Sequence, residues 1–334
     1  MANWQLTADL TDATQKAPAG IINAEAYTSL VNRGFVSVAK EKFAQVREME
    51  ALVNMEKVKF STGTGATYAG IGGQVPMNRD DEDPIYASAA TGFPWSYTTQ
   101  QFRLFLKITR AAIEDDTGIG FTKERIPEML EAHIETVETR IADLFNRADG
   151  VGATGAPALA PDGGYLLDES RPNPDADAGT WGNVEATGAI TGDMLFDAAL
   201  NARKGVAPNG RLFAQTIKRI AIPAEYENAM FTLLSTNKLV GTNYNDASWA
   251  AAKFNMDQVS VLSRLTSPFI FYFLSDPKSM DNGIRLAKYQ DVSSNVAWGS
   301  GSETDVLFGR IRSRWGLYLR DVRKTLRGGR LSAL

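Results

Sequence analysis

The most regular pattern of apolar and polar positions in the chain lies between residues 122 and 145. Apolar side chains recur there every three or four residues, which is the spacing of one helix face: Ile126, Leu130, Ile134, Val137, Ile141, Leu144 and Phe145. The opposite face carries charged residues: Glu128, Glu131, Glu135, Glu138 and Arg140. Thr122 is suited to cap the start of such a helix, and Pro127 fits its first turn. The pattern predicts a long amphipathic helix.

Shorter patterns predict further elements on both sides of this helix. Helical spacing runs through residues 24–58 with a bend at Gly34, and its end at 52–60 alternates like a strand. Beyond the long helix, we expect helices at 193–202 and from Pro223 onward. Alternating or continuously apolar runs predict strands at residues 216–222, 259–262, 269–274, 284–289 and 306–319.

Residues 61–97 differ from the rest because no continuous core pattern crosses them. They hold a dense set of glycines and prolines: Gly63, Gly65, Gly70, Gly72, Gly73, Pro76, Pro84, Gly92 and Pro94. No Gly-Lys-Ser/Thr sequence follows, so we interpret the glycines as loop flexibility and not as a phosphate cradle. We predict a two-stranded excursion that projects from the body. Because an isolated ribbon of this kind is marginal in water, it should lie on another subunit.

Two other stretches lack a core pattern. Residues 1–20 are polar with scattered alanines and threonines, which predicts a flexible arm. Residues 150–192 are rich in Gly, Ala, Pro and Asp, and their only apolar anchors are Tyr165–Leu167 and Trp181. Structured sequence resumes on both sides, so we interpret this second stretch as a loop and not as a linker between domains.

Composition narrows the class of protein. The 334 residues are 44% hydrophobic and 22% charged, as in a soluble globular protein. There is no cysteine, which excludes disulfides, thiolate metal sites and cysteine nucleophiles. The longest apolar run, Phe269–Leu274, is far shorter than the about 20 residues that cross a bilayer. No secretory signal pattern follows Met1, so we expect a protein made in a cytoplasm, with no membrane partner.

The net charge of −4 conceals an uneven distribution. Residues 301–334 contain eight Arg or Lys against three acids, a net +5, which leaves −9 for the first 300 residues. Arg310, Arg312 and Arg314 alternate, so on a strand they share one face. That face is a solvated surface, a contact for an acidic neighbour, or a contact for packaged nucleic acid. No motif for sequence-specific DNA reading is present.

The chain offers little catalytic chemistry. His133 is the single histidine, which excludes a multi-histidine metal site, and no G-x-S-x-G motif accompanies it. A structural or exposed role for His133 is the favoured interpretation, and a hydrolase built around it is the alternative. The acidic clusters Asp80–Asp83 and Glu114–Asp116 lack the ligand spacing of an EF-hand. We therefore expect no enzyme, no catalytic residue, no cofactor and no metal.

The order of these features resembles the major capsid proteins of tailed bacteriophages, which have the HK97-like fold, and among them the Mu-like head subunits. The resemblance spans about residues 20–330 and rests on stretches in a fixed order: Phe60–Gly65 with the Gly-rich loop, Pro76, the acidic patch and Gly92-Phe93; Phe105–Arg110 with Ile113–Asp116; Arg125–Leu130 continuing to Phe145; Ile220–Pro223; Phe271–Pro277; and Gly316–Asp321.

The resemblance implies an α+β fold with four parts. These are an N-terminal arm (1–54), an extended loop (55–103), a peripheral domain with a spine helix (104–149 and 284–314) and an axial domain (150–283 and 315–334). It also implies assembly into hexamers and pentamers that form the icosahedral head around double-stranded DNA, contacted without sequence specificity.

Further partners and the location follow from the same resemblance. Portal, scaffolding and cement proteins are the expected partners, and the virion, assembled in the host cytoplasm, is the expected location. No long helical scaffolding extension precedes the arm, so the scaffold should be a separate protein. Lys57 and Lys59 lie at the base of the loop, so we expect no cross-linking through lysine. A bacterial encapsulin-type nanocompartment shell is the alternative within the same fold.

The candidate inter-subunit contacts lie on the extended loop and on the basic run. They are Tyr68, Asp80, Asp81, Glu82, Asp83, Phe93, Trp95, Arg310, Arg312 and Arg314. A finer hypothesis pairs Asp80–Asp83 with Arg312 or Arg314 of a neighbouring copy. Exposed ion pairs contribute only about 0–1 kcal/mol each, so such pairing would set the register of assembly more than its strength.

Overall fold

The computed structural model describes most of the chain, in the ranges 47–71, 89–109, 120–148, 150, 159–173, 179–187, 190–207, 212, 215–235, 249–266, 270–279, 282–298, 306–323 and 325–330. The predicted arm, most of the helical pattern at 24–58 and the acidic clusters Asp80–Asp83 and Glu114–Asp116 lie outside these ranges. No helix within the described ranges is both long and apolar enough to cross a membrane.

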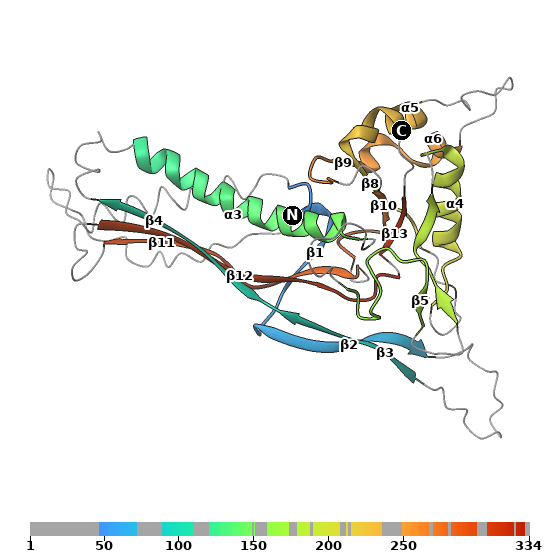
Figure 1. Cartoon of the computed structure of the whole chain (residues 1–334), viewed down its shortest axis with the longest axis horizontal. Coiled ribbons are helices and arrows are strands. Elements are labelled where there is room, and N and C mark those ends of the chain that lie inside the picture. Colours follow the sequence, from blue (N-terminus) through green and yellow to red (C-terminus); the bar gives the residue numbers. More distant parts are fainter. Residues whose placement is uncertain are drawn as a thin grey trace, which may run out of the picture.

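A four-stranded sheet and one long helix form the elongated part of the molecule (Figure 1). The sheet order is β1 (Asn54–Lys57), β11 (Ile284–Trp298), β12 (Val306–Leu319) and β4 (Gln100–Thr109). β1 pairs with β11 in parallel, and the other pairings are antiparallel. Helix α3 (Gly120–Asn146) runs along one face of this sheet. The predicted strands at 284–289 and 306–319 are thus confirmed, and the first extends nine residues further to Trp298.

The long helix follows its predicted apolar face but differs from the prediction in two ways. It begins at Gly120, so Thr122 and Pro127 lie inside it and not at its start. Glu138, placed on the charged face by its spacing, is only 2% exposed. Its carboxylate accepts hydrogen bonds from the backbone N–H groups of Met49 (2.8 Å) and Glu50 (3.0 Å). A buried carboxylate requires such donors, and here they come from the start of the short 3₁₀ helix η1 (Glu50–Leu52).

A second, five-stranded sheet organises the wider end of the molecule. Its order is β7 (Val184–Thr187), β13 (Leu326–Arg330), β10 (Ile270–Leu274), β8 (Arg219–Pro223) and β9 (Val259–Leu262). All five residues of the central strand β10 are buried, as expected for a strand covered on both faces. The predictions of strands at 216–222, 259–262 and 269–274 are confirmed, although β8 begins three residues later than predicted.

Helices cover this second sheet on one side (Figure 1). They are α4 (Gly192–Arg203), α5 (Glu227–Ser235) and α6 (Trp249–Lys253), with 3₁₀ turns η3 (Ala224–Tyr226) and η4 (Met256–Gln258). The side chain of Thr191 caps α4 by accepting from the Met194 N–H. Pro223 precedes η3 and α5, as its fixed φ favours, so both predicted helices are confirmed.

A two-stranded ribbon extends from the body along its lower edge (Figure 1). β2 (Thr62–Ile71) pairs antiparallel with β3 (Ala89–Thr98), and no third strand joins them among the described residues. The predicted two-stranded excursion is confirmed. A smaller pair, β5 (Arg171–Pro172) and β6 (Thr180–Trp181), lies within the Gly- and Pro-rich stretch at 150–192.

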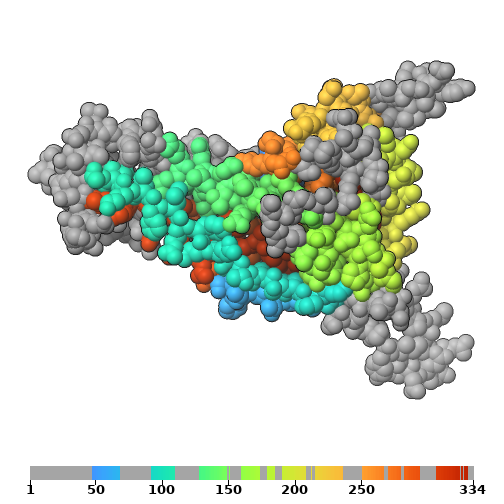
Figure 2. Space-filling model, viewed as in Figure 1, coloured from blue at the N-terminus to red at the C-terminus, as the bar shows by residue number. Residues whose placement is uncertain are grey.

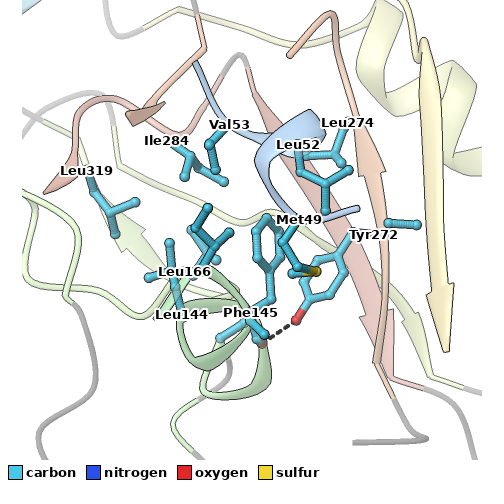
Figure 3. Close-up of a cluster of buried hydrophobic side chains, with 14 of the residues drawn as sticks. Met49, Leu52, Val53, Leu144, Phe145, Leu166, Tyr272, Leu274, Ile284 and Leu319 are labelled. Atoms are coloured by element: carbon cyan, nitrogen blue, oxygen red, sulfur yellow. Dashed lines mark hydrogen bonds between the residues drawn. The ribbon is translucent and has the colours of Figure 1, made fainter. Parts of the chain in front are cut away.

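One buried cluster joins the two sheets at the end of α3 (Figure 3). Phe145 meets Tyr272 of β10 edge to face at 5.0 Å between ring centroids, and the Tyr272 hydroxyl donates to the Phe145 carbonyl. Leu52 and Leu166 complete the cluster around them. Leu166 belongs to the 150–192 stretch, so the predicted anchor at Tyr165–Leu167 ties this loop into the core.

We predict that Phe145→Ala lowers the free energy of unfolding by about 3–5 kcal/mol, because the ring is fully buried and its removal leaves a cavity. Urea unfolding of the unassembled chain, followed by circular dichroism, measures this. Phe231→Ala is the matched control, since Phe231 is 54% exposed and its loss should change stability by about 0.5 kcal/mol or less. Equal losses in the two variants would contradict this account of the core.

Candidate assembly surfaces

Two aromatic side chains of β3 lie across the glycines of β2. A Cβ atom placed on Gly63 would come within 2.4 Å of the Tyr97 ring, and one on Gly65 within 2.4 Å of the Trp95 ring. Glycine is therefore required at both positions because a ring occupies the space of a side chain. The interpretation of these two glycines as loop flexibility is wrong. They lie within a strand and make room for Trp95 and Tyr97.

The same rings fasten the base of the ribbon to the body. Trp95 packs against Tyr318 of β12 at 5.5 Å, and the guanidinium of Arg320 lies 4.2 Å from the Trp95 ring centroid. Tyr97 also contacts Tyr318, at 5.2 Å. Aromatic and cation–π contacts of this kind contribute about 0.5–1.5 kcal/mol each. The predicted contact residue Trp95 is thus an anchor within its own chain, and a role between subunits stays a prediction.

A carboxylate organises the polar side of this anchor. Glu56 of β1 accepts from Arg285 Nη1 (2.8 Å) and from the Tyr318 hydroxyl (2.9 Å), and Arg320 Nη2 lies 3.5 Å away. Burial alone would raise the pKa of Glu56, but these bonds and charges together hold it below its usual value. Burial and the bond to Glu56 raise the pKa of Tyr318 to about 12. At neutral pH, Glu56 therefore stays ionised and Tyr318 stays protonated, so the hydrogen bond between them is kept.

We predict that Gly65→Val detaches the base of the ribbon, because its side chain would overlap the Trp95 ring. An overpacked site of this kind costs about 1–3 kcal/mol. Hydrogen exchange of residues 62–66 and 94–98 in the unassembled chain should become faster. Thr64→Val is the control, since Thr64 is exposed on the opposite face of β2 and valine is favoured in strands. Unchanged exchange in Gly65→Val would refute the ring-over-glycine packing.

The larger sheet presents a basic face on the side opposite α3. Along β12, residues 311, 313 and 315 are buried, whereas Arg310 is exposed and Arg312 and Arg314 are half-buried. The predicted common face of the three arginines is confirmed. Arg314 lies over the Tyr289 ring of β11 at 4.9 Å, which holds its guanidinium against the sheet.

The neighbouring edge strand β4 adds to this basic face. Arg103 stands directly opposite Arg312 in the antiparallel register, and Lys107 lies over the ring of Phe308 at 5.8 Å. Phe105, between the two cations of β4, is 57% exposed. Like charges directly opposite one another destabilise a sheet unless an anion lies between them. We call Arg103, Lys107, Arg310, Arg312 and Arg314 the basic face.

On the other side of β12, the positions of β11 that pair with the three arginines carry uncharged residues. Opposite Arg312 and Arg314, β11 carries Ser293 and Gln290. The Nε atoms of both arginines are buried, and neither has a hydrogen-bond partner among the described residues. Arg103 and Lys107 are not among the contact residues predicted from the sequence. Their alternation with exposed Phe105 is the signal that could have identified them.

A groove lies between α3, the ribbon and the α3-facing side of β12. Its two halves each have a volume of about 280 Å³, and both are lined by Leu144 and Leu317. Arg140 and Arg147 line one half, and Trp95 lines the other. In Figure 2, part of β12 is visible in the hollow beside α3, above the ribbon.

The structure places the other predicted contact residues only in part. Tyr68 and Phe93 lie on the ribbon strands, where Tyr68 pairs with Thr91, and the side chain of Tyr68 is outside the described part. Phe93 is half-buried. The four acids of Asp80–Asp83 also lie outside it, so their contact with the basic arginines stays a prediction.

His133 is buried and not on the charged surface of α3. It is 8% exposed and borders a small cavity with Arg47, Glu50 and Lys288. Burial, assisted by the charges of Arg47 and Lys288, lowers the pKa of His133 to about 4. No serine or threonine is hydrogen-bonded to it in the described part, and the same residues contain no group of acids and histidine suited to a metal ion. A structural role for His133 fits this environment.

We predict an acid-sensitive step in stability from His133. Its native pKa lies below the value of 6.5 for the free side chain, so its contribution is complete above about pH 6.5 and is lost as the pH falls toward 4. Between pH about 7.5 and 4.5, the wild type should lose about 2–3 kcal/mol more of its unfolding free energy than His133→Gln. Urea unfolding at both pH values tests this, and parallel losses in the two proteins would exclude it.

Comparison by sequence finds no matching family model and no matching curated protein. Comparison by structure finds capsids. The chain is similar to a protein in a structure titled "Capsid structure of the Cyanophage P-SCSP1u", with a TM-score of 0.51 and 10% identity over 97% of this chain and 94% of that one.

Two further similar structures have lower scores. A chain from Mycobacterium phage Bobi has a TM-score of 0.49 and 11% identity, covering 87% of this chain and 92% of that one. A chain from the "Acidic stable capsid structure of Helicobacter pylori bacteriophage KHP30" has a TM-score of 0.47 and 11% identity, covering 85% and 88%.

The cyanophage similarity extends over nearly the full length of both chains, so it concerns the whole arrangement of helix, two sheets and ribbon and not one shared motif. The expected α+β class is confirmed by the helices and sheets described above. The fold of this chain is therefore the HK97-like fold of phage capsid subunits.

Proposed function

We propose that the chain is the major capsid protein of a tailed phage, which assembles with copies of itself into a closed shell around double-stranded DNA. The main observation in support is the β2–β3 ribbon. It is fastened to the body at its base and has no third strand in the described part. Such a ribbon is marginal in water by itself and gains order by lying on another subunit. The similarity to a cyanophage capsid chain supports the same proposal.

The exposed edge of the larger sheet supports self-association as well. β4 is an edge strand, and Leu104 (39% exposed) and Phe105 (57% exposed) are open to solvent. Exposed apolar side chains on an edge strand invite pairing with another chain, which natural monomers avoid. In a closed shell every copy repeats the same contacts, so the β4 edge of each subunit would be covered by a neighbouring subunit.

The proposed division into domains follows the sheets with adjusted boundaries. The arm ends near Val53, and the extended loop corresponds to the ribbon, residues 62–98. Residues 54–57, 100–103 and 315–319 pair in the larger sheet, so we assign them to the peripheral domain with the spine helix α3. The axial domain then corresponds to the five-stranded sheet and its helices.

The remaining partners are part of the same proposal. Hexamers and pentamers, portal, scaffolding and cement proteins, and non-specific contact with DNA belong to a head subunit of this kind. A location in the virion and assembly in the host cytoplasm follow from that role. The particular resemblance to Mu-like head subunits stays a prediction. We propose a structural and not an enzymatic role, since no serine or threonine hydroxyl of the described residues is hydrogen-bonded to His133.

Within this proposal, the acidic segment Asp80–Asp83 of one copy contacts the basic face of its neighbour. The segment connects β2 with β3 and carries four negative charges. The basic face carries five cations, two of them directly opposed, and an acidic segment would relieve that repulsion. Each ion pair at a surface contributes only about 0–1 kcal/mol. We therefore propose that this contact sets the register between neighbouring subunits more than the strength of their association.

We predict that the double variant Arg103→Glu/Arg312→Glu lowers the yield of closed shells about tenfold, since about 1.4 kcal/mol per contact changes association tenfold. Adding Asp81→Arg/Glu82→Arg to the same chain should restore the yield. Electron microscopy of particles formed with the neighbouring genes measures it. The control is Lys204→Glu/Lys253→Glu, which reverses two exposed cations elsewhere and should assemble normally.

The circular dichroism spectrum and melting temperature of each unassembled variant must match the wild type, which separates assembly from folding. If the reversed basic face assembles normally, the proposed contact is wrong and the capsid function still stands. If the wild type forms only small oligomers under every condition, the function itself is wrong.

A further inference from the structure

Two strands have an edge without a hydrogen-bonded neighbouring strand among the described residues. β4 is the last strand of the larger sheet, where β12 is its single partner. β2 has β3 as its single partner in the ribbon. Both strands are ten residues long. An unpaired strand edge presents a row of N–H and C=O groups that can pair with another chain.

The side chains of the two strands are complementary in size. On β4, Leu104 is 39% exposed and Phe105 is 57% exposed, so both keep apolar surface open to solvent. On β2, the exposed positions between 62 and 66 carry only threonine or alanine, and glycines stand between them. A large side chain that lies across small ones on a neighbouring strand buries apolar surface, as the rings of β3 do over the glycines of β2.

Charge favours β2 over the other edges as the partner of β4. β4 carries Arg103 and Lys107, so two β4 edges placed side by side would bring like charges together. β2 has no charged residue over its whole length. β3 is uncharged as well, but Pro94 has no N–H to donate, and Trp95 next to it packs against Tyr318 of its own subunit. β2 is therefore the edge of the ribbon that fits β4.

We propose that β2 of one copy pairs antiparallel with the free edge of β4 in a neighbouring copy, so that the larger sheet gains the two strands of the ribbon. This inference rests on the proposed assembly into a shell and specifies the contact that the ribbon makes there. Main-chain hydrogen bonds hold the two copies together. When the two strands overlap over their full lengths, Ala66 of β2 lies opposite Phe105 of β4.

The antiparallel direction also brings the acidic segment toward the basic face. β2 ends at Ile71, which then lies at the start of β4, and the chain continues from there toward Asp80–Asp83. Gln101, near the start of β4, is the register partner of Arg314. Parallel pairing would instead place Ile71 beside Thr109, at the other end of β4 from Arg314.

This pairing joins the copies head to tail, because the two free edges are different surfaces of the same chain. Each copy offers one β2 edge and one β4 edge, and both are covered on every copy when the copies close into a ring. Two copies joined by a single contact would still leave one edge of each kind open to further chains. The pairing therefore favours closed rings of subunits over isolated dimers.

The absence of cysteine from the chain allows a direct test by disulfide cross-linking. Chains with Ala66→Cys are assembled together with chains that carry one cysteine at a single position from 103 to 107, and the shells are oxidised. We expect covalent dimers on a non-reducing gel with Phe105→Cys. The two adjacent positions should give few or none, since their side chains lie on the other face of β4. A single maximum elsewhere in the scan supports the same pairing in a shifted register.

Ser235→Cys is the matched control, because Ser235 is exposed on α5, outside both strands, and should give no dimer with Ala66→Cys. Thr64→Cys with Lys107→Cys is a second pair in the expected register, so the test does not depend on one variant. Normal shells without a cross-link in any combination, or with equal cross-linking at all five positions, overturn the pairing and leave the capsid function standing. A wild type that forms no shells under any condition overturns both.

Discussion

The structure depends on how the two-stranded ribbon is attached to the body at its base. A ribbon has two exposed edges and two faces, and its own side chains bury little apolar surface. In this chain the attachment is concentrated at one end, where Trp95 packs against Tyr318 and lies beneath Arg320. Glu56 binds the polar side of that same end. If the chain assembles as proposed, the remaining length of the ribbon lies on a neighbouring subunit.

The two faces of β12 contact different parts of the molecule. One face, with Ser313 and Trp315, lies beneath α3 and forms part of the interior. The other carries the arginines of the basic face and then Tyr318, which receives the ribbon. Because side chains alternate along a strand, β12 has interior residues on one face and the arginines on the other.

Much of the fold could be predicted from the sequence because its signals are local. The periodicity that ends at Phe145 gave the long helix, and the alternation at 306–319 gave β12 with its arginines on one face. The ribbon was predictable from what residues 61–97 lack, namely a core pattern. The whole architecture, however, was inferred through a resemblance, since strand order and sheet partners depend on contacts between distant residues.

The errors arose where tertiary contacts override local patterns. Glu138 has the spacing of a surface residue but accepts two backbone N–H groups from residues 49 and 50, which no helical pattern reports. The glycines of β2 resemble a flexible loop until the rings of Trp95 and Tyr97 are placed over them. Arg103 was missed because its significance comes from Arg312 across the sheet, more than two hundred positions later in the sequence.

The most direct test of the account is a cryo-electron microscopy reconstruction of the particles that the chain forms, at a resolution that separates side chains. The account predicts a closed shell in which the ribbon of each copy lies on a neighbour, with residues 80–83 against that neighbour's basic face. Particles in which the ribbon folds back on its own subunit, or in which the basic face is open to solvent on every copy, would contradict it.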